Sequence, residues 1–171
     1  MAGNPQRAVV TRSTLAGMEI QYTAIPAERL EAMRAAGADE FQNKWQLRVA
    51  EGWEPLRCCL RKAEADEDIA LICYSPWESP SPWMEAGPVF VHYEGCAGYT
   101  DTSAYPASLL HNKSILNPFD HTGARFYERI TFLDPEDDHE QALREVLAQP
   151  EVAFLHVRSG AAGCFHFRAD K

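Results

Sequence analysis

Two cysteine–histidine pairs have residue types and spacing that could do chemistry. His92 and Cys96 stand four residues apart in the segment GPVFVHYEGC, and His156 and Cys164 stand near the end of the chain. Nucleophilic catalysis by a thiol needs a histidine within hydrogen-bond reach to accept its proton. These four residues are therefore the candidate catalytic groups.

The same four residues could also supply two imidazole nitrogens and two thiolates, a tetrahedral set of the kind that zinc prefers. Zinc ligands usually stand as close pairs on tight loops, whereas these four would have to converge from separate strands. The pattern therefore assigns no metal ligand and predicts no cofactor. A zinc-stabilised structural domain stays an alternative.

A pair of strands expected at residues 152–159 and 164–168 decides which of the later side chains share a face. Side chains alternate between the two faces of a strand, so only two parities need comparison. If Arg158 lies opposite Cys164, the aliphatic side chains of the first strand join two phenylalanines on one apolar face. We predict this parity. The apolar face then carries Leu155, Val157, Phe165 and Phe167, and the other face carries Phe154, His156, Arg158, Cys164, His166 and Arg168.

A face rich in arginine and histidine could bind an anion in an otherwise acidic protein. Arg158 offers a planar fork that suits carboxylate or phosphate, and a neighbouring cation could lower the pKa of the Cys164 thiol. The alternative is the solvated face of an antiparallel sheet, where histidine and arginine are ordinary residents.

Two expected loops hold further candidate ligand-binding residues. Four prolines make residues 75–88 a loop, because each proline removes a backbone donor. Its Trp77 and Trp83 either pin this loop to the core or form the aromatic face of a mobile lid. Asp120 stands in the expected loop 117–123, where a general acid or base could sit.

The remaining cysteines are expected to pack in the interior. Cys58, Cys59 and Cys73 lie in or beside apolar segments, and small buried thiols are common core residues. The chain has five cysteines in total and no export signal, so we expect free thiols and no disulfide framework.

The helices and strands that we expect around these residues indicate an α+β fold. It has a mostly antiparallel sheet and two short helices, and the C-terminal strand pair closes it. Pro26 and Gly37 bound a helix at 27–36, and Asp134 caps a second, acidic helix at 135–149. Further strands are expected at 19–25, 56–60, 69–74, 88–94 and 125–132.

The whole chain fits one domain over residues 19–171, after a mobile N-terminal segment at 1–18, because 171 residues with 46% apolar content can build one core. A net charge of −9 argues against nucleic acid or an anionic membrane as partner. With no apolar stretch long enough to span a bilayer and no secretory signal, we expect a cytoplasmic protein. The pattern does not define an oligomeric state.

Several segments resemble the bacterial domain-of-unknown-function family 1203. They are Arg57-Cys58 before a hydrophobic strand, GPVFVH followed by Cys96, residues 106–109, and QPEVAFLHVRSGAAGCF at 149–165. The resemblance runs from about Leu56 to the end and implies a small stand-alone bacterial protein with no established activity. By position, the residues that match its motifs are Arg57, Cys58, His92, Cys96, His156, Arg158 and Cys164.

The sequence departs from that family pattern at two places. Asn117-Pro118-Phe119-Asp120 stands where the family has an arginine-aromatic-aspartate stretch, and Ala162 stands where an aromatic residue is usual. If these positions line a pocket, the resemblance implies that this member takes a different ligand.

Together these observations predict a small-molecule protein, an enzyme or a binder, that handles an anionic metabolite. Arg158 would hold the anion, Cys164 or Cys96 would act as the nucleophile, and His156 or His92 would move the proton. The second hypothesis is an interaction module that docks a protein through the acidic helix or the tryptophan-containing loop. The residues that we assign to ligand binding are Arg158, Arg57, Cys58, Asp120, Trp77 and Trp83.

Overall fold

The computed structural model describes residues 17–171, and it consists of two antiparallel sheets with a helix beside each. The α+β class predicted from the sequence is confirmed. The mobile segment expected at 1–18 lies outside the described residues, except for its last two positions. Within residues 17–171, no helix is long and apolar enough to cross a membrane.

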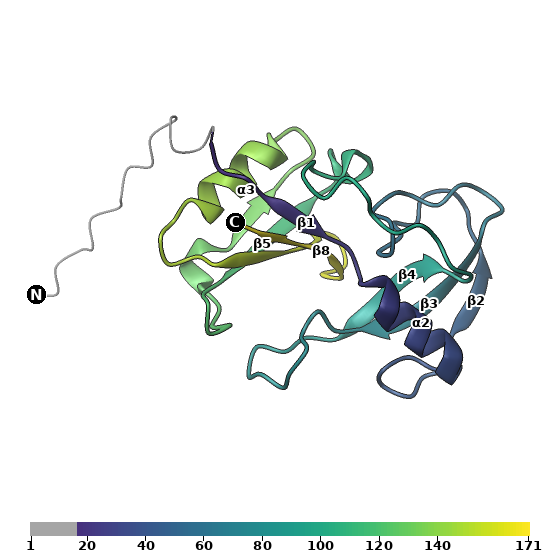
Figure 1. The fold of residues 1–171 in the computed structure, drawn as a ribbon. Helices are drawn as coiled ribbons and strands as arrows, with labels where there is room; N and C mark the ends of the chain where they lie inside the picture. Colours follow the sequence, from purple (N-terminus) through teal and green to yellow (C-terminus); the bar gives the residue numbers. More distant parts are fainter. Residues whose placement is uncertain (1–16) are drawn as a thin grey trace, which may run out of the picture.

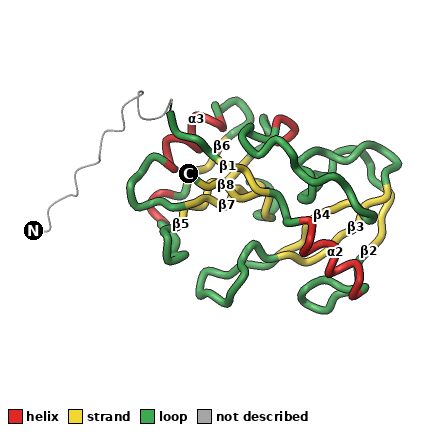
Figure 2. The backbone as a smooth tube through the Cα atoms, in the orientation of Figure 1, coloured by secondary structure: helices red, strands yellow, loops and turns green. Residues whose placement is uncertain are grey.

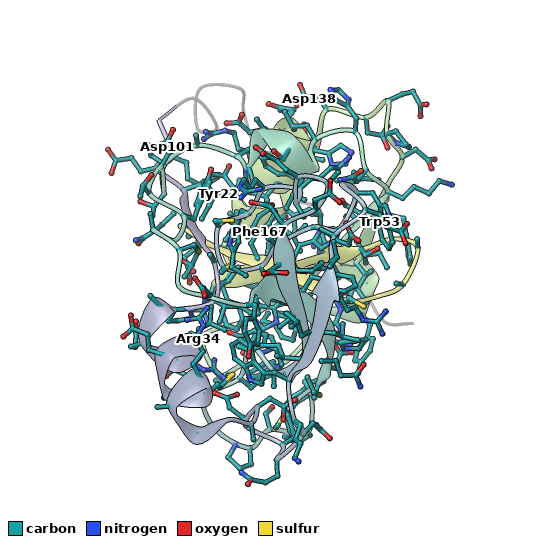
Figure 3. The ribbon with its side chains drawn as sticks, turned by 90° about the vertical axis from the view of Figure 1, so that its right-hand side faces the viewer. Tyr22, Arg34, Trp53, Asp101, Asp138 and Phe167 are labelled. Carbon is teal, nitrogen blue, oxygen red and sulfur yellow. The ribbon has the colours of Figure 1, made fainter. Side chains whose placement is uncertain are left out.

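The larger sheet has five strands in the order β1-β8-β7-β5-β6. Its core contains an edge-to-face pair of Tyr22 and Phe167, whose ring centroids are 5.9 Å apart (Figure 3). Helix α3, His139–Leu147, lies beside this sheet (Figure 1). Its Leu143 and Leu147 pack into the core. The strands are β1 Gln21–Thr23, β5 Ser114–Phe119, β6 Thr131–Leu133, β7 Phe154–Ser159 and β8 Phe165–Asp170.

The smaller sheet has three strands in the order β2-β3-β4 and forms a second lobe. Helix α2, Ala27–Ala36, follows β1 directly and packs Leu30 and Met33 into the core of this lobe. The strands are β2 Gln46–Val49, β3 Asp68–Tyr74 and β4 Gly87–His92. Two short 3₁₀ helices, η1 Ala107–Leu109 and η2 Tyr127–Arg129, lie in connections that are otherwise loop (Figure 2).

The two lobes meet where β8 reaches the second core. Phe165, the first residue of β8, packs in the core of the smaller lobe, with its ring 5.5 Å from that of Tyr74. Arg57 donates from Nε to the Phe165 carbonyl at 2.7 Å, and the neighbouring Leu56 forms a parallel bridge with Phe90 on β4. The segment that contains Arg57 is therefore held against both sheets.

The predicted C-terminal strand pair is present, with a register that differs from the expected one. His156 pairs with Arg168 and Val157 with Phe167, which keeps the predicted parity but shifts the strands by two residues. A bulge between Val157 and Arg158 then pairs Arg158 with Phe165. The expected pairing of Arg158 with Cys164 is therefore wrong, and Phe165 leaves the apolar face.

The face that carries His156 is not open to solvent. His156 is 1% exposed and His166 is 3% exposed, because the smaller lobe and the 75–88 loop cover this face. A solvated sheet face, the alternative interpretation, is therefore wrong as well.

Four other expected elements differ from those observed. The segment 56–60 is a turn and no strand, since the Leu60 amide bonds back to the Leu56 carbonyl and Leu60 has a φ of 57°. Four of its five residues are buried without alternation, so the apolar run only resembled a strand. The second helix begins at His139, because the Asp138 carboxylate accepts from the Gln141 amide at 3.0 Å and caps it there.

The expected boundaries of the loop at 117–123 and of the strand at 125–132 also differ from those observed around β5. Residues 117–119 continue β5 instead of opening a loop. β6 pairs with β5 only as far as Leu116, so no residue of β6 lies beside Pro118 to need the amide proton that proline lacks. The strand expected at 125–132 is interrupted by η2. Thr131–Leu133 pairs with β5 as a strand, and Arg125 forms an isolated antiparallel bridge with Phe119.

Candidate metal centre

Three cysteines and one histidine converge at one end of the smaller lobe. Cys58 and Cys59 lie in the turn after Leu56, His92 ends β4, and Cys96 lies in the loop that follows. The Arg57 amide donates to the Phe90 carbonyl at 2.9 Å, which holds the turn beside the end of β4. One potential ligand atom from each of the four side chains lies within 4.8 Å of the other three.

The distances inside this Cys₃His cluster are close to those of a tetrahedral metal site. Cys58 Sγ lies 3.2 Å from His92 Nδ1, Cys59 Sγ lies 3.9 Å from the same nitrogen, and the two sulfurs are 4.0 Å apart. Metal–sulfur bonds of about 2.3 Å and metal–nitrogen bonds of about 2.0–2.1 Å place tetrahedral ligand atoms roughly 3.5–3.8 Å apart. Only small movements separate the cluster from that geometry.

A second layer of polar groups surrounds the His92 ring. Nε2 lies 2.9 Å from Arg61 Nη2 and 3.6 Å from Glu67 Oε1, and Arg61 and Glu67 form an ion pair at 2.5 Å. The backbone amide of His92 donates to Cys58 Sγ at 3.3 Å. A carboxylate beyond the imidazole and an amide donated to a ligating sulfur are the contacts that orient metal ligands in proteins.

The cluster favours thiolate at one cysteine. The hydrogen bond from Cys58 lowers the pKa of the Cys59 thiol to about 4, and His92 adds to the effect. The same hydrogen bond, together with the burial of Cys58, raises the pKa of the Cys58 thiol. Hydrogen bonding to Cys59 raises the pKa of His92 to about 9. Outside the ring, Arg61 lowers the pKa of Glu67 to about 2, so that this carboxylate stays charged.

The arrangement can therefore hold a soft metal ion or stabilise a reactive thiolate. Cys58 is buried, and Cys59, His92 and Cys96 are half-buried, so an ion could enter from solvent and still be enclosed by protein ligands. Cys73 lies on β3 and is not a member of the cluster.

Comparison with known proteins identifies the family. The family model described as "Protein of unknown function (DUF1203)" matches residues 53–171. The chain belongs to this family. The match contains all four members of the cluster and confirms the family resemblance seen in the sequence. No curated protein and no solved structure matches the chain.

Within the DUF1203 segment, the second predicted cysteine–histidine pair is not assembled. His156 lies among aromatic rings, with its ring centroid 4.9 Å from that of Phe119 and 5.5 Å from that of Trp77. Neither of its nitrogens has a hydrogen-bond partner among residues 17–171. Burial lowers the pKa of His156 to about 3. The Cys164 thiol instead donates to the Ala162 carbonyl at 3.7 Å.

Arg158 is occupied by internal partners. It forms an ion pair with Glu85 and donates from Nε to the Gly163 carbonyl at 2.6 Å. Arg125 pairs with the same carboxylate at 3.0 Å. The structure therefore gives Arg158 a role in fixing the 75–88 loop to the β7-β8 strand pair. Arg57, and not Arg158, lines a cavity beside the end of this hairpin.

The other predicted binding residues have local contacts. The Asp120 carboxylate accepts from the Thr122 and Ala124 amides at 2.8 and 2.9 Å and closes its own turn. Trp77 packs edge-on against Phe119 at 5.2 Å, which pins the 75–88 loop to the core as one of the two interpretations expected. The Trp83 amide donates to the Ser81 hydroxyl at 3.2 Å.

The DUF1203 cluster combines predicted and unpredicted residues. His92 and Cys96 were candidates and Cys58 was assigned to ligand binding, whereas Cys59 was expected to be a packing residue. Arg61 and Glu67 were not considered. The usable signal in the sequence was the pair Cys58-Cys59 between Arg57 and Arg61, because nearby cations favour thiolates and do not belong to a purely apolar core segment.

Proposed function

We propose that this protein binds one zinc ion through the Sγ atoms of Cys58, Cys59 and Cys96 and through Nδ1 of His92. The observation that carries the proposal is the approach of four soft ligand atoms within 4.8 Å of one another from the turn, from β4 and from the loop after it. Thiolate-rich tetrahedral sets select zinc over the harder divalent ions. Four protein ligands leave no open position, which is typical of structural zinc sites.

The charges around the cluster support the proposal. Three thiolates and a neutral imidazole around Zn²⁺ leave a net charge of about −1. The Arg61 guanidinium, 2.9 Å from the His92 ring, offsets that charge. With the metal on Nδ1, Nε2 carries the ring proton and would donate to Glu67 Oε1, 3.6 Å away, so that the carboxylate would orient the ring. Arg61 Nη2 is also a donor, and it would move back from Nε2 toward Glu67, its ion-pair partner.

The ion would fix the chain segment that Arg57 holds against both lobes. Cys58 and Cys59 directly follow Arg57, and zinc would clamp them to the end of β4. Metal-binding free energy at such sites becomes folding free energy, because the unfolded chain does not hold the ligands together. The proposed role is therefore structural, in the smaller lobe.

Metal analysis of the full chain, purified without chelator, tests the proposal. We expect about one equivalent of zinc in the wild type, and a loss of most of it in Cys59→Ser and His92→Gln. Cys73→Ser is the matched control, because Cys73 is a half-buried thiol on β3 outside the cluster. Less than about half an equivalent in the wild type, or full zinc in both cluster variants, would contradict the proposal.

A second candidate function uses the same cluster without metal. The Cys59 thiolate beside the His92 imidazole, at 3.9 Å, has the chemistry of an activated nucleophile. Alkylation of the native protein with iodoacetamide separates the two candidates. Zinc-bound Cys59 should react only after a chelator is added, whereas a free thiolate should react before every other cysteine without a chelator.

A further inference from the structure

A cavity of about 680 Å³ lies where the two lobes and the hairpin loop meet. Four parts of the chain form its wall: the segment around Arg57, the strands β3 and β4, residues 112–113 before β5, and the end of the β7-β8 hairpin. Its size is within the range of sites that bind small organic molecules, roughly 300–1,000 Å³. It is separate from the zinc ligands, none of which lines it.

We propose that this cavity binds a small organic monocarboxylate with an apolar body, with its carboxylate held by Arg57 and His166. This site is independent of the proposed zinc site. The sequence analysis expected an anion at Arg158, and the proposed binding residue is Arg57 instead.

Arg57 is a buried cation without a buried counter-ion. It is 4% exposed, and its Nε and Nη1 donate to the carbonyls of Phe165 and Pro55. No carboxylate within residues 17–171 pairs with it, and its Nη2 makes no hydrogen bond to the described residues. A buried charge normally has a paired partner, so this guanidinium is set up to receive an anion.

His166 places a second polar group against the same space. It is 3% exposed, lines the cavity, and its Nδ1 has no hydrogen-bond partner among residues 17–171. Nδ1 is sealed from the cavity, whereas Nε2 also has no hydrogen-bond partner among the described residues but is not sealed, so Nε2 is the ring nitrogen that a ligand can reach. In the tautomer with the proton on Nε2, the ring can donate to a carboxylate oxygen.

The charge of the wall agrees with an anion. Within the described part of the chain, the lining contains cationic side chains and no aspartate or glutamate, although the protein carries a net charge of −9. Lys62 and Lys113 stand at the exposed rim, and Lys113 already pairs with Asp134 at 3.3 Å. One buried guanidinium matches a single negative charge better than the double charge of a phosphate monoester.

The rest of the wall is apolar and requires a ligand with an apolar body. Trp53 and Phe90 meet edge to face, with their centroids 6.2 Å apart, and Leu71 and Pro88 continue this surface along β3 and β4. Trp53 is labelled near the outer edge of the side-chain view (Figure 3). Its side chain is 57% exposed, so its fluorescence can report on ligand entry.

The test is a binding titration on zinc-replete, full-length protein with phenylacetate, indole-3-acetate and octanoate. The matched controls are the corresponding primary amides, and phenyl phosphate tests the other anion class. We expect at least one carboxylate to bind about tenfold or more tightly than its amide, which corresponds to about 1.4 kcal/mol. Calorimetry gives the affinities, the wild-type minus Trp53→Phe difference in fluorescence follows the entry of phenylacetate and octanoate, and protection of Cys164 from alkylation places the ligand.

Two variants make the result specific to the cavity. Arg57→Gln should abolish the preference for carboxylate over amide, and Ala162→Trp should block binding by filling the cavity from the hairpin loop without altering Arg57. Ala107→Trp, at an exposed alanine on η1 outside the lining, is the matched control and should bind like the wild type. Equal affinity for acid and amide, a preference for phenyl phosphate, no binding by any carboxylate, or full binding by Ala162→Trp would each overturn the proposal.

Discussion

At the scale of single residues, the chemistry of this protein depends on groups that lack their usual partners. Cys58, Cys59 and Cys96 have a histidine among them but no disulfide, and Arg57 is a buried cation bonded only to carbonyls. The buried charge of Arg57 costs folding free energy, and a bound carboxylate would remove that cost. The cluster thiols already bond to one another and to His92, and a zinc ion would replace these weak bonds by metal–ligand bonds.

Glu67 gives a prediction at this scale. Glu67→Gln removes the charge that would orient the His92 ring, and we expect zinc affinity to fall about 10–100-fold, as is common for outer-shell partners. Competition with a chromogenic chelator measures the affinity. Glu64→Gln is the control, because Glu64 is an exposed neighbour in the same turn whose side chain makes no contact with His92. Equal affinities for the two variants would contradict this role of Glu67.

At the scale of elements, the strand pair β7-β8 is a structural wall rather than an open binding face. His156 on β7 is enclosed by aromatic rings and by the charges of Arg168, Arg158 and Arg125, and burial with these charges lowers its pKa to about 3. The predicted parity holds as far as Val157 and fails at Arg158, and the face that the alternative interpretation left in solvent is buried at His156. The second lobe covers this face, and its position cannot be predicted from the alternation of side chains along a strand.

The buried imidazole predicts acid sensitivity. Its pKa is lower in the folded protein than in the unfolded chain, so the folded state binds fewer protons, and stability is lost as pH falls below about 6.5 toward about 3. In urea unfolding, the free energy of unfolding of the wild type should fall between about pH 7 and about pH 5. We expect this fall to be about 2 kcal/mol smaller in His156→Leu. His121→Leu, at an exposed histidine, should behave like the wild type. An identical pH dependence in His156→Leu would contradict the account.

The β7-β8 loop also depends on one close approach. A Cβ on Gly160 would lie 2.9 Å from the Lys113 backbone carbon, and the Gly160 amide donates to the Lys113 carbonyl at 2.7 Å. We expect Gly160→Ala to lower the free energy of unfolding by about 1–3 kcal/mol. Gly87→Ala, where a Cβ meets nothing within 4 Å, should change it by less than about 0.5 kcal/mol. Equal effects in urea unfolding would show that the contact is not tight.

At the scale of the whole molecule, the sequence pattern predicts local elements better than their assembly. Helix α2 was predicted with its bounds because Pro26 and Gly37 mark them locally. Strand β2 was missed because all four of its residues are exposed and show no alternation. The cluster was only partly predicted, since the contact between Leu56 and Phe90 that brings Cys58 to His92 joins residues more than thirty positions apart.

The two-lobe arrangement predicts where zinc removal acts. The ligands belong to the smaller lobe and its turn, so a chelator should increase amide hydrogen exchange in β3 and β4 while β5 and β7 of the larger lobe keep their protection. Exchange followed by mass spectrometry, with and without chelator, measures both lobes in one sample. An equal increase in both lobes would mean that the ion stabilises the whole chain, and no increase would contradict a structural role.

The central claim is that three cysteines and one histidine share one metal ion. X-ray absorption at the zinc edge on the full-length protein, purified without chelator, tests it most directly. We predict three sulfur neighbours at about 2.3 Å and one nitrogen at about 2.0–2.1 Å. A shell of oxygen and nitrogen alone, or protein without bound zinc, would contradict the claim.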